Sequence, residues 1–318
     1  MKIGIIGAGA IGGWIGAKLA GGGHDLSVLA RGKTLAAIAR DGLILREDDA
    51  ETRHAVASSD STTALGPQSI LVITVKAQTL PALAASLAPM IGPETLIIPM
   101  LNGVPWWFLG KGEQLASVDP AGSVAAALPY HQLIGCVVHA SAACPAPGVT
   151  ALKFTDRIIL GEPGSGASER LTELAGVFQA AGINAVASDH VRRDIWYKLW
   201  GNMTMNPISA LTLATADRIL ADPLVNGLVL AVMDEAKAIG AKIDCPIEQS
   251  GADRNAVTRK LGAFKTSMLQ DVEAGRGLEL DALLAAPREI AQRFGAPTPS
   301  IDALFGLARL MGQSRGLY

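Results

Sequence analysis

The chain opens with Ile3-Gly4-Ile5-Ile6-Gly7-Ala8-Gly9-Ala10-Ile11-Gly12, an apolar run that leads directly into a glycine-rich hexapeptide. The pattern predicts a β-strand that turns sharply into a helix, because residues 13–20 continue as a mostly apolar segment. Gly7 would make the tight turn, Gly9 would let the backbone approach a pyrophosphate, and Gly12 would let the helix pack closely on the strand. The helix N-terminus would direct its unpaired amides at the phosphates. We therefore expect residues 7–12 to bind a dinucleotide, although such a turn also forms without a ligand.

The composition of the chain bounds its class. With 318 residues, of which 49% are hydrophobic, it is long enough for two domains with sizeable cores. The formal net charge is -2 and there is neither a basic stripe nor a basic tail, so we expect no nucleic-acid partner. The three cysteines, Cys136, Cys144 and Cys245, are odd in number and lack metal-ligand spacing, as suits a reducing cytoplasm. This spacing also leads us to expect no metal site. Since no apolar span of membrane length occurs, we expect a cytoplasmic protein that binds no membrane.

The identity of the cofactor depends on the end of the second predicted strand, residues 25–30. In this fold the end of that strand lies beside the adenosine ribose, where an acidic residue would bind the 2′-hydroxyl of NAD. This chain has Arg31 there, followed by Lys33, so two cations stand where a 2′-phosphate would lie. The sequence therefore favours NADPH; the alternative is a solvated arginine at a strand end.

Two further apolar runs, residues 69–75 and 95–100, read as buried parallel strands. Lys76 follows the first run, and Asn102 with Gly103 follows the second. Ligands of open parallel sheets bind outside the carboxyl ends of the strands, so we expect Lys76 and Asn102 to lie at the site. An asparagine before glycine is equally typical of a simple turn, and that alternative stays open for Asn102.

The pair Trp106-Trp107 comes shortly after Asn102. Two adjacent tryptophans can anchor a protein at a membrane surface, fill a core or form one wall of a ligand pocket. We expect the third of these, a wall over the nicotinamide.

The remaining pattern divides the chain into an α/β part and a helical part. We expect three strands that extend the same sheet, then a helix and a last strand: residues 136–142, 149–154, 157–160, 168–181 and 185–188. Five helices are predicted after them: residues 191–210, 223–240, 246–261, 266–273 and 281–294. The predicted fold is therefore an α/β chain with an N-terminal Rossmann-type dinucleotide-binding domain, residues 1–188, and an all-helical C-terminal domain, residues 189–318.

A second constellation lies in the first predicted helix of the C-terminal half. Lys198, Asn202 and Asn206 are spaced at i, i+4 and i+8, which places them on one helix face. Large apolar residues lie between them and would cover the other faces of the helix. Examples are Trp196, Leu199 and Trp200. A solvated surface stripe has little reason to carry so many large apolar neighbours, and asparagine is a poor helix former. We therefore interpret this face as functional.

Ser267 and Glu279 flank a predicted break in the chain. In one unbroken helix they would be roughly 18 Å apart. Gly275 and Gly277 lie between them, and two glycines are expected to break the helix. The break would let Glu279 fold back toward the same site as Ser267. The alternative is an N-cap serine and a surface acid at the start of a new helix.

Taken together, these residues resemble the ketopantoate reductase family. The features that carry the resemblance span nearly the whole chain: Gly7-Ala8-Gly9-Ala10-Ile11-Gly12, Arg31, Lys76, Leu101-Asn102-Gly103, Lys198 with Asn202 and Asn206, Ser267-Met268-Leu269-Gln270-Asp271, and Glu279. The resemblance implies an NADPH-dependent oxidoreductase that reduces a 2-oxo acid to a 2-hydroxy acid. The expected reaction is 2-dehydropantoate (ketopantoate) to pantoate, a step of pantothenate biosynthesis.

The resemblance also implies a role for each matching residue. Lys198 resembles the catalytic lysine, which donates a proton to the ketone oxygen, and Glu279 resembles the acid that helps to hold the substrate and the lysine. Ser267 resembles the serine that binds the substrate carboxylate. The others resemble the asparagines that line the nicotinamide and the substrate, and a lysine on the cofactor side: Asn102, Asn202, Asn206 and Lys76.

Two departures from the family pattern concern the substrate. This chain has Phe264 where better-known members have an asparagine, three residues before the serine. It has Leu284-Ala285 where they have an Asn-Gly pair. The pocket is therefore expected to differ, and two alternatives stay open: reduction of a different 2-oxo acid, or an inactive NADP-binding sensor. The apolar helical domain is compatible with a homodimer.

Overall fold

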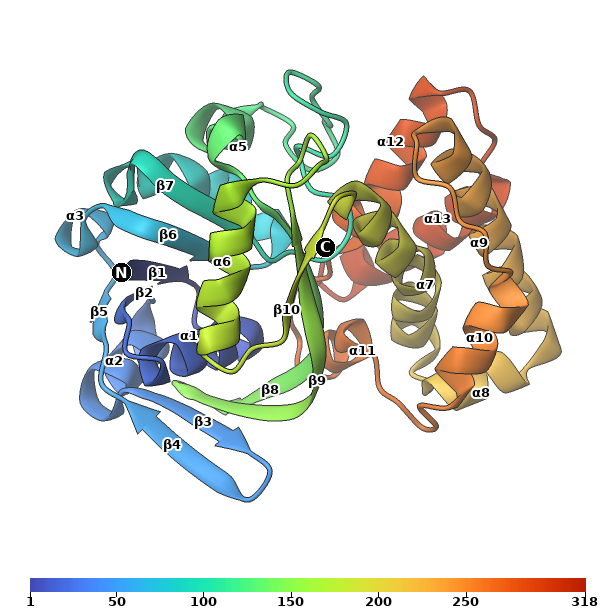
Figure 1. Ribbon diagram of the computed structural model, residues 1–318. Helices are drawn as coiled ribbons and strands as arrows, with labels where there is room; N and C mark the ends of the chain where they lie inside the picture. The colour runs from blue at the N-terminus through green and yellow to red at the C-terminus, as the bar shows by residue number, and fades with distance from the viewer. The chain divides into compact units, whose positions relative to one another are not determined.

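The computed structural model describes residues 1–318, which form two compact units (Figure 1). The first unit carries all the strands, and the second is helical, so the predicted fold class is confirmed. The first unit consists of Met1–Leu101, Gly110–Gly112 and Ala121–Arg192, and the second of Asn102–Leu109, Glu113–Pro120 and Arg193–Tyr318. Two short segments of the N-terminal half thus belong to the second unit. The predicted division at a single point, after residue 188, did not include them.

The first unit contains a five-stranded parallel sheet of Rossmann type in the order β5-β2-β1-β6-β7. Strand β1 lies at its centre, and Ile3, Ile5 and Ile6 of that strand are fully buried, as expected of a parallel strand covered on both faces. The strands are β1 (Lys2–Ile6), β2 (Asp25–Leu29), β5 (Ala57–Ser59), β6 (Gln68–Ile73) and β7 (Ile91–Pro99).

The later strands of this unit form a second sheet, so the prediction that they extend the first one is wrong. Strands β8 (Gly135–Ala146) and β9 (Val149–Gly161) pair as a long antiparallel hairpin. On its other edge β9 pairs in parallel with β3 (Leu43–Glu47) and β10 (Ala185–Ser188). Since both edges of β9 are occupied, the strand has no edge free for the first sheet. Strand β4 (Ala50–His54) completes this sheet through a hairpin with β3.

Helix α1 (Ala10–Gly21) lies between the two sheets, because it contacts strands of both. Its buried residues point to all sides of the helix, as expected of a helix enclosed by other elements. The core therefore runs from the first sheet through Trp14 and Leu19 of α1 to the second sheet and then to α6 (Glu169–Ala180). The other helical pieces of this unit are α2 (Gly32–Asp41), α3 (Thr62–Leu65), α4 (Leu80–Leu83) and α5 (Ser123–Ala127), with 3-10 turns at Ala77–Thr79, Ala84–Met90 and Tyr130–Gln132.

The second unit is built from helices, as predicted, with two that the periodicity did not reveal, α8 and α13. The predicted helix at residues 246–261 is shorter in the structure. The elements are α7 (Val191–Thr212), α8 (Ala216–Ala221), α9 (Pro223–Lys242), α10 (Gly251–Arg259), α11 (Ser267–Glu273), a π-helical turn (Asp281–Ala285) that leads into α12 (Ala286–Arg293), and α13 (Pro299–Ser314). None of these helices is both long enough and apolar enough to cross a lipid bilayer.

Helix α7 is fixed against α9 through two buried tryptophans. The indole N–H of Trp196 donates to the carbonyl of Ala236 at 3.1 Å, and that of Trp200 donates to the carbonyl of Met233 at 2.8 Å. Gly240 permits the first contact, because a Cβ at this position would lie 2.5 Å from the Trp196 indole nitrogen. The apolar faces of α7 are thereby buried, as its sequence predicted.

Candidate functional site

The glycine-rich turn has the steric requirements expected of it. Gly7 has φ +93°, and a Cβ there would lie 2.8 Å from Val75 Cγ1. A Cβ on Gly12 would lie 2.1 Å from the Gly7 carbonyl oxygen and 2.3 Å from Thr74 Oγ1. The Thr74 hydroxyl donates to that same carbonyl at 2.6 Å and so holds the turn against β6. A Cβ on Gly12 would therefore displace backbone, and a Cβ on Gly7 would crowd the Val75 side chain at a φ that L residues rarely adopt.

Gly9 is different, because nothing lies within 4 Å of the position that its Cβ would take. It is the exposed N-cap of α1, and no side chain caps the helix there. The first amides of α1 therefore face open space with no side-chain acceptor. Such a helix N-terminus binds anions, and the room in front of Gly9 suits the pyrophosphate of a dinucleotide.

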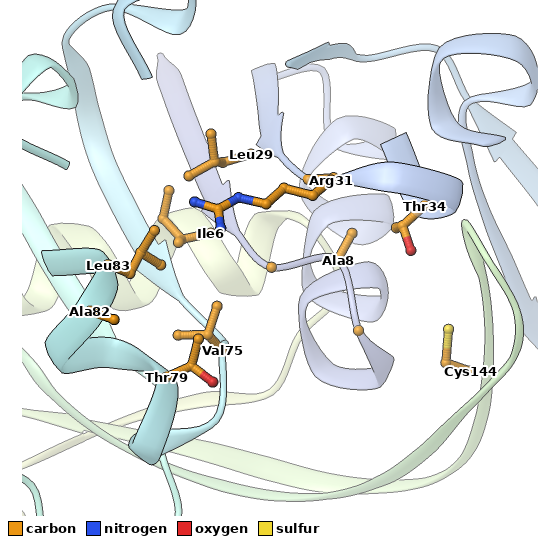
Figure 2. A pocket seen from close by; sticks show the side chains of 13 residues that line it. Ile6, Ala8, Leu29, Arg31, Thr34, Val75, Thr79, Ala82, Leu83 and Cys144 are labelled. Atoms are coloured by element: carbon orange, nitrogen blue, oxygen red, sulfur yellow. The ribbon is translucent and has the colours of Figure 1, made fainter. Parts of the chain in front are cut away.

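A cavity of about 360 Å³ opens beside this turn (Figure 2). Its volume lies in the range of small-molecule sites. It is lined by residues from the glycine turn, the end of β2, the start of α2, the segment after β6 and the β8–β9 hairpin: Ile6, Gly7, Ala8, Gly9, Leu29, Ala30, Arg31, Thr34, Val75, Thr79, Ala82, Leu83 and Cys144. The open N-terminus of α1 and this cavity together fit a dinucleotide.

Arg31 is one of the lining residues, as the sequence predicted for a cation at the end of β2. It is the exposed N-cap residue of α2, and Figure 2 shows its guanidinium reaching across the cavity from the start of that helix. Lys33 is exposed and does not line the cavity. Lys76 precedes the 3-10 turn Ala77–Thr79 as its N-cap, one residue after the lining residue Val75. Its role at the cofactor stays a prediction.

Among the lining residues that the sequence analysis did not select, three carry a hydroxyl or a thiol: Thr34, Thr79 and Cys144. Thr34 lies in the first turn of α2, three residues after Arg31, and this spacing could have revealed it. Thr79 follows Lys76 in the same short turn. No sequence pattern around Cys144 indicated a cofactor site. This residue lies on β8, in the hairpin that β8 forms with β9, and reaches the cavity through that hairpin.

The predicted polar face of the second unit lies on one continuous helix. Lys198, Asn202 and Asn206 all belong to α7, so their spacing does place them on one face. Lys198 and Asn202 are half-buried, and Asn206 is buried. The Lys198 Nζ donates a hydrogen bond to Asn102 Oδ1 at 3.0 Å. Two residues that the sequence analysis selected on separate grounds are therefore in direct contact.

Asn102 is held in place by the residues that follow it. Gly103 has φ +79°, and a Cβ there would lie 2.4 Å from the carbonyl oxygen of Ala282. The Val104 amide donates to the same carbonyl at 2.8 Å. Ala282 is in the π-helical turn, three residues after the half-buried Glu279. Asn102 does precede a turn glycine, but that turn serves to dock Asn102 on the segment that carries Glu279.

The predicted break between Ser267 and Glu279 is confirmed, since α11 ends at Glu273 and Gly275 has φ +65°. The alternative of an N-cap serine is wrong, because the N-cap is Thr266, whose hydroxyl oxygen accepts from the Leu269 amide at 3.1 Å. Ser267 is exposed at the first residue of α11.

The start of α11 is tied to α7. Thr266 Oγ1 lies 2.5 Å from Ser209 Oγ, and the Ser209 hydroxyl donates to the backbone carbonyl of Asn206 at 2.8 Å. These contacts tie the start of α11 to the end of the polar face of α7. The role of Ser267 stays a prediction.

The burial of four apolar side chains bears on the predictions made for the substrate pocket and the nicotinamide. Trp106 and Trp107 are 5% and 2% exposed, so they are core residues and the preferred interpretation as a wall over the nicotinamide is wrong. Leu284 is fully buried in the π-helical turn, so it does not line an open pocket. Phe264 is 37% exposed, and its carbonyl accepts from the Ala216 amide at 3.0 Å. Among the family departures, Phe264 is therefore exposed, Ala285 is half-buried and Leu284 is buried.

Two family models match the chain. The model described as "Ketopantoate reductase PanE/ApbA" matches residues 3–165, and the model described as "Ketopantoate reductase PanE/ApbA C terminal" matches residues 190–312.

Known proteins and solved structures match over the full length. The chain is 42% identical over 328 residues to a 2-dehydropantoate 2-reductase of Mesorhizobium japonicum, covering 100% of both chains. A solved structure from Ralstonia solanacearum MolK2 has a TM-score of 0.97 and 53% identity, covering 100% of this chain and 99% of that one. The 2-dehydropantoate 2-reductase from Methylococcus capsulatus has a TM-score of 0.86 and 28% identity, covering 99% of this chain and 98% of that one.

The two glycines that flank the start of α1 give separable predictions. Gly12→Ala should lower the thermal midpoint, because its Cβ would lie 2.1 Å from the Gly7 carbonyl oxygen and overpacking costs about 1 to 3 kcal/mol. Gly9→Ala should cost at most about 1 kcal/mol, the difference between the two residues at an N-cap. It should nevertheless weaken dinucleotide binding, measured by titration. If Gly9→Ala binds like the wild type, the pyrophosphate does not approach there.

Proposed function

The chain belongs to the ketopantoate reductase family, and we propose that it reduces 2-dehydropantoate to pantoate with NADPH as the hydride donor. The observation that carries the proposal is the contact of Lys198 Nζ with Asn102 Oδ1 at 3.0 Å on the polar face of α7. This contact places an ammonium group beside an amide side chain in a half-buried position. Such a group is suited to a carbonyl whose oxygen gains negative charge during reduction.

The first unit is proposed to hold the cofactor. The open N-terminus of α1 in front of Gly9 would receive the pyrophosphate, and Arg31 at the cavity edge would pair with the 2′-phosphate. The end of β2 offers no acidic side chain to bind a free 2′-hydroxyl. When bound, NADPH supplies the hydride that is added to the carbonyl carbon of the substrate.

Lys198 is proposed as the general acid. Its ammonium group carries three protons, and Asn102 Oδ1 accepts one of them. The ammonium would also donate to the ketone oxygen, where it polarises the carbonyl and then gives a proton to the nascent alkoxide. Because Gly103 and Val104 dock on Ala282, the Asn102 acceptor is fixed and orients the lysine.

The remaining polar groups of the second unit are proposed to hold the substrate. The amides of Asn202 and Asn206 can both donate and accept, as a 2-oxo acid requires. Ser267 would donate to the carboxylate, and Glu279 would accept from a hydroxyl of the substrate or from Lys198. A different 2-oxo acid is the second candidate substrate, because Phe264 presents an exposed apolar ring where family members have an amide.

The direct test is incubation of the purified chain with NADPH and 2-dehydropantoate, with other 2-oxo acids in parallel. Loss of nicotinamide absorbance with 2-dehydropantoate is the expected result. Binding of NADPH without turnover of any 2-oxo acid would refute the proposal and favour a sensor.

Lys198→Ala should lower kcat by about 10²- to 10⁴-fold, the usual contribution of a general acid. Affinity for NADPH should stay within about twofold, because the lost charge acts mainly in the transition state. Steady-state kinetics and cofactor titration measure the two quantities. The matched control is Lys260→Ala, which removes an exposed lysine of the same unit. Near-normal turnover of Lys198→Ala would remove the lysine from the mechanism.

Arg31→Ala should weaken NADPH binding by about 1.5 to 3 kcal/mol, the contribution of a hydrogen bond to a charged group. Binding of NADH should barely change, because NADH lacks the 2′-phosphate. Lys33→Ala is the control, since this neighbouring cation does not line the cavity. Equal losses for both cofactors would show that Arg31 acts on the structure and not on the phosphate.

The ratio of kcat/KM for 2-dehydropantoate and 3,3-dimethyl-2-oxobutanoate, which lacks only the distal hydroxyl, tests the role of Phe264. A site built to pair a hydroxyl rejects the analogue by about four to five orders of magnitude, whereas an apolar pocket discriminates by about one to two. We expect the smaller preference here, and Phe264→Asn should increase it. A preference of thousands in the wild type would show that Phe264 does not affect specificity.

A further inference from the structure

The segment after α13 folds back on its own helix in a defined way. The Leu317 amide donates to the Gly312 carbonyl at 2.8 Å, and the Gly316 amide donates to the Gln313 carbonyl at 3.1 Å. Gly316 has φ +66°. This pair of bonds with a left-handed glycine is the Schellman motif, which fixes the direction of the chain after a helix. Residues 317 and 318 are therefore held in a set position.

These two residues contact the segment that carries Glu279. The Leu278 amide donates to the Leu317 carbonyl at 2.9 Å, and the Tyr318 hydroxyl donates to Asp281 Oδ1 at 2.6 Å. Glu279 lies between the two attachment points. Its backbone neighbours Leu278 and Leu280 are 2% and 0% exposed, so the segment is anchored on both sides of the glutamate.

Asp281 also begins the π-helical turn on which Asn102 depends. The next residue, Ala282, accepts the Val104 amide at 2.8 Å and packs against Gly103. The Tyr318 hydroxyl is thus linked through one carboxylate to the backbone that supports both Glu279 and the Asn102 loop.

The surroundings of Asp281 explain why a phenol is a useful partner. Burial raises the pKa of the Asp281 carboxyl, and the hydrogen bond from Tyr318 works in the opposite direction. Burial, and after it the hydrogen bond with Asp281, raises the pKa of the Tyr318 phenol, so the phenol stays a donor at neutral pH. Asp281 is half-buried, so without this donor its carboxylate would lose a hydrogen bond that water replaces only in part.

We propose that Tyr318 is a positioning residue: through its hydrogen bond to Asp281 it holds the segment from Leu278 to Ala282, and thereby the places of Glu279 and Asn102. The inference rests on the proposed function for the role of those two residues in reduction of the 2-oxo acid. Tyr318 itself takes no part in the chemistry.

The test removes single groups from this link. Tyr318→Phe deletes only the hydroxyl and should lower kcat/KM for 2-dehydropantoate by about five- to tenfold, the effect of one lost hydrogen bond. The loss should come mainly from a higher KM, with NADPH affinity unchanged, because the cofactor cavity is in the first unit. Asp281→Ala should reproduce the loss, whereas Asp281→Asn, which keeps an oxygen acceptor, should retain most activity.

A double-mutant cycle separates the link from general destabilisation. Tyr318→Phe combined with Asp281→Ala should be no worse than Asp281→Ala alone, because both variants remove the same bond. Strictly additive losses, or an unchanged kcat/KM in Tyr318→Phe, would overturn the inference. So would a loss that is accompanied by equal loss of NADPH affinity.

Amide hydrogen exchange tests the link independently of turnover. Tyr318→Phe should speed exchange of the amides from Leu278 to Ala285 and of Val104, and it should leave the first unit unchanged. If the wild type reduced no 2-oxo acid, the proposed function would fail, and this measurement would still decide whether Tyr318 holds the segment. Unchanged exchange there would overturn the inference alone.

Discussion

The polar face of the second unit depends on one constraint: the orientation of α7 about its own axis is fixed by its packing against α9. A buried indole N–H needs an acceptor, and Trp196 and Trp200 find theirs in the backbone of α9. Phe108 stacks on Trp196 with ring centroids 5.8 Å apart and adds a second wall. With these faces buried, the direction of Lys198 is set. The Lys198 ammonium then donates to Asn102 Oδ1 at 3.0 Å.

The parts of the fold that could be predicted from the sequence are those where the local geometry restricts which residues can occur at a position. Gly7 and Gly12 were identified because each position excludes a Cβ, and the α7 face because a spacing of four residues has one meaning on a helix. The second sheet was not readable, since β9 pairs with β3, which lies about a hundred residues earlier in the chain. The Trp106-Trp107 pair was misassigned because large aromatics are equally common in cores and at ligand walls. Thr266 and Ser267 are adjacent and both suited to an N-cap, so only the structure could choose between them.

The two departures from the family pattern, at Phe264 and at Leu284-Ala285, differ in how they can affect a bound ligand. Leu284 contributes to the core of the π-helical turn, and its effect on a ligand could only be indirect. Phe264, in contrast, exposes part of its ring. A change of residue type at a family position is therefore informative about specificity only after its burial is known. The same holds for the cation pair after β2, of which Arg31 alone lines the cavity.

Each of the two units is discontinuous in the sequence, and this affects how the chain can be made. Phe108 belongs to the second unit, yet its partner Trp196 is synthesised about 90 residues later. Synthesis proceeds at roughly 5 to 20 residues per second, so about 4 to 18 s pass between the synthesis of Phe108 and that of Trp196 in α7. During that interval the growing chain exposes Trp106, Trp107 and Phe108 together. The nascent protein thus has a period of aggregation risk that its mature surface does not reveal.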